Sequence, residues 1–194
     1  MRLAVLIVAA FTAVAGPALV GTAPAHAYSY AAAGAEPLLD GREALFAAVS
    51  AGNWTDAQKA VDALKPELDY LDGHEDPGIS KVFADALAAK DPKSVSAAFV
   101  RAASAEIQRR INGARDNLSD YQTAKVLVVK AQRFYTAIAG DLPPDASEAV
   151  ADGLQHALDA VGNPGVFGVG ARPADPAAFA AARIAVLKAI GRPM

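Results

Sequence analysis

The chain has 194 residues, of which 53% are hydrophobic and 20% charged, with a formal net charge of −3 and no cysteine. The lack of cysteine excludes disulfide scaffolds, thiolate zinc sites and cysteine nucleophiles, and the slightly negative charge gives no general electrostatic reason to bind nucleic acid. A composition rich in alanine and poor in aromatic residues favours an all-α protein over a β-sandwich.

The start of the chain has the pattern of a secretory signal peptide. Met1-Arg2 is a short positive region, residues 3–15 are apolar but too few to span a bilayer, and Ala25-His26-Ala27 provides small residues before a cleavage point. We therefore expect residues 1–27 to be removed after Ala27. The product would be a periplasmic or secreted protein with no transmembrane helix in its mature chain.

The mature chain is expected to be one all-α domain after a short lead-in. Residues 28–39 have little periodicity and predict a mobile segment, so the domain is predicted over residues 40–194. Capping-box spacings and glycines at helix ends delimit the elements. Asp76-Pro77, Asp91-Pro92 and Asp175-Pro176 also predict helix starts, since proline suits the first helical position. Helices are predicted near residues 41–51, 55–71, 77–90, 92–117, 120–139, 145–161 and 176–190.

These elements predict a helical bundle of about six or seven helices, built from antiparallel hairpins. Residues 45–57 and 83–95 align with each other, each with a turn between two helices. The first turn, over residues 52–57, resembles the turn and second-helix start of a tetratricopeptide repeat. The two copies are spaced further apart than the about 34 residues of that family, and no third copy follows. The sequence therefore predicts a pair of helical hairpins.

A cluster of acidic residues at the end of the second long helix is the first candidate site. We call it the acidic elbow, and its candidate ligands are Asp69, Asp72, His74, Glu75 and Asp76. Carboxylate oxygens suit hard divalent cations, and one imidazole extends the range to transition metals. The elbow therefore predicts a divalent-metal site for iron, manganese, zinc or calcium. The alternative is a solvated loop in which Asp76 only caps the next helix.

A group of basic residues on the two longest predicted helices is the second candidate site. We call it the basic hairpin, and it consists of Arg109, Arg110, Lys125, Lys130 and Arg133. If the two helices run antiparallel, Arg110 lies near the level of Lys125 and Lys130, and a positive strip results. Such a strip would bind an acidic protein or an anionic small molecule. The alternative is that Glu106 pairs with Arg109 and Arg110 at helical spacing.

No catalytic motif is found, because the chain has no nucleophile elbow, phosphate-binding loop or His-Glu-x-x-His string. We therefore expect a non-enzymatic, exported helical-bundle binding protein. The first hypothesis is a divalent-metal or iron-handling accessory that uses the acidic elbow. The alternative is a protein–protein adaptor that docks an acidic exported or membrane protein through the basic hairpin.

Overall fold

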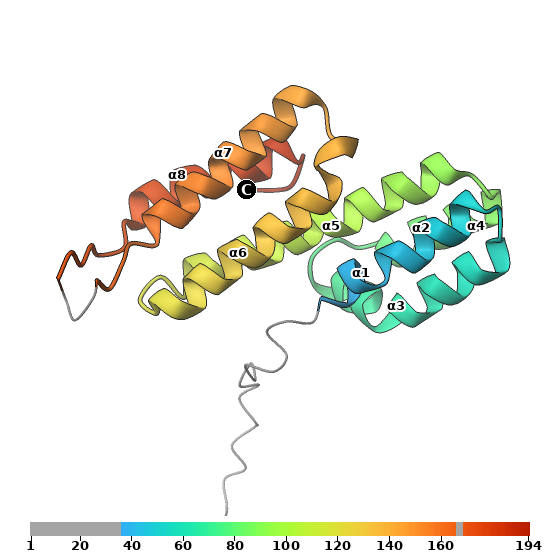
Figure 1. The fold of residues 1–194 in the computed structure, drawn as a ribbon, viewed down its shortest axis with the longest axis horizontal. Coiled ribbons are helices and arrows are strands. Elements are labelled where there is room, and N and C mark those ends of the chain that lie inside the picture. Colours follow the sequence, from blue (N-terminus) through green and yellow to red (C-terminus); the bar gives the residue numbers. More distant parts are fainter. Residues whose placement is uncertain (1–35, 166–168) are drawn as a thin grey trace, which may run out of the picture. The chain divides into compact units, whose positions relative to one another are not determined.

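Helices account for nearly all of the regular structure (Figure 1). The computed structural model describes residues 36–165 and 169–194. Over these residues it contains seven α-helices longer than one turn and no β-strand, which confirms the all-α class. The expected signal peptide, residues 1–27, lies outside the described residues. None of the described helices is both long enough and apolar enough to cross a bilayer.

The observed helices follow the predicted ones within a few residues. In chain order they are α1 (Pro37–Asp40), α2 (Arg42–Ser50), α3 (Trp54–His74), α4 (Ile79–Ala89), α5 (Pro92–Asp116), α6 (Tyr121–Ile138), the 3₁₀ turn η1 (Ala139–Asp141), α7 (Pro144–Ala160) and α8 (Pro176–Ala189). Two predicted Asp-Pro starts are confirmed, because the carboxylates of Asp91 and Asp175 accept backbone N–H groups in the first turns of α5 and α8. The third, at Asp76, is not used: Gly78 precedes α4 with no side-chain cap.

The helical unit begins earlier than the sequence suggested. Residues 36–39 were expected to belong to the lead-in, but Leu38 is fully buried and Glu36 is only 1% exposed. Leu38 belongs to α1 and packs into the core, while the carboxylate of Asp40 accepts the backbone N–H of Glu36. The structured unit therefore starts at Glu36, and the rest of the predicted lead-in, residues 28–35, lies outside the described residues.

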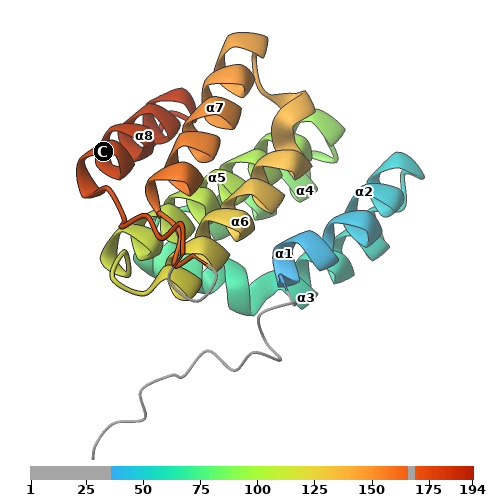
Figure 2. The ribbon, with the colours of Figure 1, turned by 60° about the vertical axis from the view of Figure 1, so that its left-hand side comes forward.

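Helix α5 lies at the centre of the contacts and is buried along most of its length. It packs against α3, α4, α6 and α8, and α5 and α6 lie side by side as the long hairpin expected from their short connection (Figures 1 and 2). Phe99, Ile107 and Ile111 supply its apolar contacts. The same helix also buries charged side chains, Glu106 and Arg110. Because buried charges are costly unless they are paired, the partners of these two residues need to be identified.

Candidate functional site

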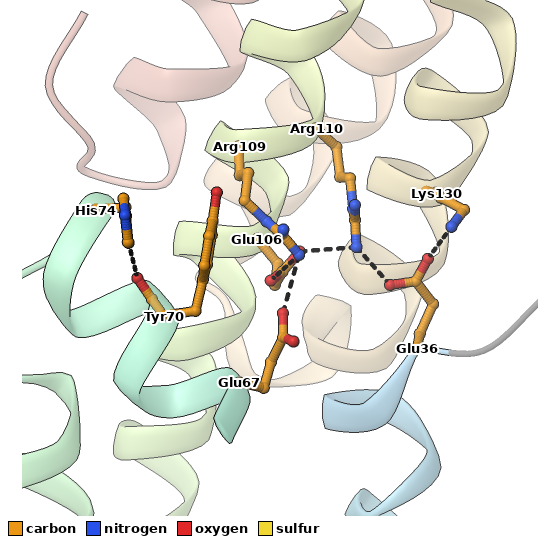
Figure 3. A network of polar contacts seen from close by, with 8 residues as sticks. All are labelled: Glu36, Glu67, Tyr70, His74, Glu106, Arg109, Arg110 and Lys130. Atoms are coloured by element: carbon orange, nitrogen blue, oxygen red, sulfur yellow. Dashed lines mark hydrogen bonds and ion pairs between the residues drawn. The ribbon is translucent and has the colours of Figure 1, made fainter. Parts of the chain in front are cut away.

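Three charged side chains of α5 form the centre of an ion network (Figure 3). Arg109 and Arg110 follow Glu106 at helical spacing, and both contact its carboxylate. Arg109 Nη2 lies 2.7 Å from Glu106 Oε1, and Arg110 Nη2 lies 3.2 Å from Glu106 Oε2. Glu106 has no exposed surface. The pairing that the sequence offered as an alternative within the basic hairpin is thus present, and it is buried.

A glutamate at the start of the helical unit joins α5 to α6. Glu36 Oε2 lies 2.7 Å from Arg110 Nη2, and Glu36 Oε1 lies 2.8 Å from Lys130 Nζ (Figure 3). Arg110 and Lys130 are each only 4% exposed. The prediction that Arg110 and Lys130 lie at the same level of the hairpin is confirmed by their shared partner. Their burial means that these two cations are not part of an exposed positive strip.

Helix α3 contributes the third carboxylate. Arg109 Nη2 donates to Glu67 Oε1 at 2.9 Å while it also contacts Glu106, and the guanidinium lies 4.8 Å from the ring centroid of Tyr70. Tyr70 stacks on His74, with 4.4 Å between ring centroids. We call Glu36, Glu67, Glu106, Arg109, Arg110 and Lys130 the buried charge network. It connects α3, α5, α6 and the first residue of the described chain.

The electrostatics of this network centre on Glu106. Burial and hydrogen bonding with the nearby Glu67 carboxyl raise the pKa of Glu106 to about 8, although Arg110 and Arg109 act in the opposite direction. Desolvation is the largest cause, because the charged form of a carboxyl loses its hydration when no water can reach it. At neutral pH the network therefore holds a protonated carboxyl between two arginines.

The residues of the acidic elbow do not converge on one point. Asp69 pairs with Lys65 at the surface, and Asp72 Oδ1 accepts the backbone N–H groups of Gly78 and Ser80. His74 is turned back onto its own helix, with Nδ1 at 2.8 Å from Tyr70 O. Among the residues that the structure describes, no group of three or more metal-ligating side chains is placed to hold an ion. The elbow thus lacks the geometry that the metal hypothesis required.

Asp76 holds the C-terminal segment instead of capping α4. Its carboxylate accepts two hydrogen bonds from Arg101 of α5, at 2.8 and 2.7 Å, and a further one from Arg192. The hydrogen bond from Arg101 is the largest of the effects that lower the pKa of Asp76. Arg192 also donates to Gln108 at 2.6 Å and to the carbonyl of Glu75 at 2.7 Å. Two arginines therefore satisfy the carboxylate that was expected to bind a metal.

Glu75 is partly buried and does not join its neighbour in these ion pairs. Burial raises the pKa of its carboxyl, while Arg109 and Arg192 nearby lower it. Its backbone carbonyl, rather than its side chain, is the group that receives Arg192.

The outer face of α6 carries the remaining members of the basic hairpin. Lys125 and Arg133 are exposed, and Lys125 Nζ donates to the hydroxyl of Tyr121 at 3.0 Å. Val126 and Val129 lie between them in sequence and are 38% and 39% exposed. We call Lys125, Val126, Val129 and Arg133 the α6 face. It is a smaller positive surface than the sequence suggested, and it includes exposed apolar side chains.

Comparison with known protein families, curated proteins and solved structures finds no match to this chain. The resemblance of residues 52–57 to a tetratricopeptide repeat therefore gains no support from a family match. The hairpins themselves are present, because α2 packs against α3 and α4 packs against α5.

Proposed function

We propose that this chain is a non-enzymatic, exported helical-bundle protein that docks an acidic partner protein through the α6 face. One observation carries the proposal: two half-exposed valines lie between two exposed cations on a helix that has no acidic residue. Exposed apolar side chains with charged neighbours are typical of protein interaction sites.

The chemistry of the α6 face defines the partner. Lys125 and Arg133 would attract carboxylates and guide encounter, while Val126 and Val129 would contact an apolar spot on the partner. The complementary surface therefore has a small aliphatic or aromatic centre with acidic residues around it. Such an interface would weaken with salt, because exposed charges are screened within about 8 Å at physiological ionic strength.

The competing proposal, a divalent-metal or iron-handling accessory, has weaker support. It depends on the acidic elbow, where Asp76 is engaged by two arginines and Asp72 by two backbone N–H groups. A metal ion would have to displace these hydrogen bonds before it could gather ligands. The adaptor proposal needs no such rearrangement, because the α6 face is already exposed.

The proposal is tested by partner capture with charge-reversed variants. Wild-type chain, Lys125→Glu/Arg133→Glu and the matched control Lys59→Glu/Lys81→Glu, which reverses two exposed lysines of α3 and α4, are immobilised and exposed to the exported protein fraction at low salt. We expect the wild type and the control to retain the same acidic protein. The α6 variant should lose at least about tenfold of this retention.

Equal retention by all three chains, or a captured protein that high salt does not release, would count against docking through the α6 face. Binding of an anionic small molecule, the third possibility for the basic hairpin, would appear as protection of wild-type chain without any captured protein.

A further inference from the structure

We infer that the buried charge network is a proton-operated latch: the protonated Glu106 carboxyl keeps α3 packed against α5, and loss of this proton at alkaline pH opens that contact. This inference concerns the interior of the helical unit and does not depend on the proposed docking function. It is argued from the burial of Glu106, from the groups that face it and from the position of Glu67.

The first step is the position of the two carboxyls. Glu67 of α3 and Glu106 of α5 meet at one nitrogen, Arg109 Nη2, which lies 2.9 Å from Glu67 Oε1 and 2.7 Å from Glu106 Oε1 (Figure 3). When both carboxyls are ionised, like charges from two different helices face each other at this point. Protonation of one removes the repulsion and leaves a hydrogen-bonding group in its place.

The second step is the charge that surrounds Glu106 on every side. From its own helix it faces Arg109 and Arg110, and from α3 it faces Glu67. Behind Arg110 lie Glu36 and, from α6, Lys130, which are paired with each other at 2.8 Å. Arg110 is therefore already neutralised by Glu36, and Arg109 by Glu67. The arginines have anionic partners without an ionised Glu106.

The third step is access to water. The side chain of Glu106 has no exposed surface, whereas that of Glu67 is 20% exposed and lies at the edge of the network. An ionised Glu106 can be hydrated only if its cover moves, and the cover at the solvent side is the α3 segment that carries Glu67 and Tyr70. The raised pKa of Glu106, about 8, agrees with this geometry, because it reports the same desolvation and the same carboxyl neighbour.

The test is amide hydrogen exchange of α3 as a function of pH, after correction for the intrinsic pH dependence of exchange. One proton links closed and open states, so the opening equilibrium constant for residues 67–74 should rise by up to about tenfold per pH unit between pH 5 and 8 and then level off. Residues 179–187 of α8, which do not contact the network, should not follow this rise.

Two variants make the test specific. Glu106→Gln keeps the shape of the protonated carboxyl and should remove the pH dependence, whereas Glu148→Gln, at an exposed position of α7, should leave it unchanged. Glu67→Gln removes the facing carboxylate and should move the alkaline transition to higher opening pH or abolish its repulsive part, while the chain stays folded at neutral pH.

The latch is overturned if α3 in the wild-type chain exchanges with the same corrected rate across pH 5 to 9, or if Glu106→Gln retains the wild-type profile. Should Glu106→Gln fail to fold, the wild-type profile with its α8 reference still decides, because it requires no substitution.

Discussion

Replacing Arg110 with methionine is expected to lower the free energy of unfolding by about 3–5 kcal/mol, the usual cost of removing one partner of a buried ion pair. Methionine keeps most of the apolar stem that lies by Phe134 but removes the guanidinium. Glu36 would then keep only Lys130 as a partner, in a site where both are almost completely buried. Urea denaturation at pH 7 measures the loss.

The control for this substitution is Lys59→Met, which breaks the exposed pair with Asp56 on α3. Because exposed ion pairs contribute about 0–1 kcal/mol, its effect should be several times smaller than that of Arg110→Met. Equal effects of the two substitutions would show that the buried charge network does not hold the helices together.

The stability of the wild-type chain is expected to fall as the pH rises from about 5 to 8. Glu106 has a pKa raised from 4.5 to about 8 in the folded chain, so the folded state binds the proton more tightly than the unfolded state. Its contribution is fully present below the unfolded pKa and is lost as the pH rises through the folded one. The slope from this group reaches at most about 1.4 kcal/mol per pH unit.

Comparison with Glu106→Gln isolates this effect, because glutamine cannot ionise and still can hydrogen-bond with Glu67 and Arg109. The variant should gain stability relative to the wild type steadily from pH 5 to pH 8, as measured by urea denaturation at each pH. Asp76 has the opposite sign: its pKa is lowered, so its contribution is lost only in acid, below this window. Parallel pH profiles for the two chains would contradict the assignment.

The sequence was sufficient for the helices because their signals are local. Asp91 and Asp175 cap helices as predicted, since an Asp-Pro pair provides both the acceptor and the fixed backbone angle within a few residues. The level of Arg110 and Lys130 also followed from a short connection between antiparallel helices. Pro66 was expected to kink or interrupt the second long helix, yet α3 continues through it from Trp54 to His74.

The candidate site was harder, because its partners come from distant parts of the chain. The acidic elbow and the basic hairpin each looked like a surface for an external ligand. In the folded chain they partly satisfy each other, as Asp76 does with Arg101 and Arg192. Charge of one sign in a short window therefore does not show whether the complementary charge is a ligand or another helix.

Two members of the network had no sequence signal at all. Glu36 lay in the segment taken as a lead-in, and Glu67 was only one of several acids near the elbow. The one available indication was the helical spacing of Glu106 with Arg109 and Arg110 on a helix long enough to be central. A glutamate in the middle of such a helix suggests a buried pair when the helix is covered by neighbours on several sides.

The most direct measurement is the titration of the Glu106 side-chain carboxyl by ¹³C NMR in the wild-type chain, assigned with Glu106→Gln. A buried, latched carboxyl predicts a midpoint of about 8, with amide signals of α3 near Glu67 changing over the same pH range. A midpoint close to the ordinary value of 4.5 would mean that Glu106 is ionised at neutral pH, and the protonated network would be refuted.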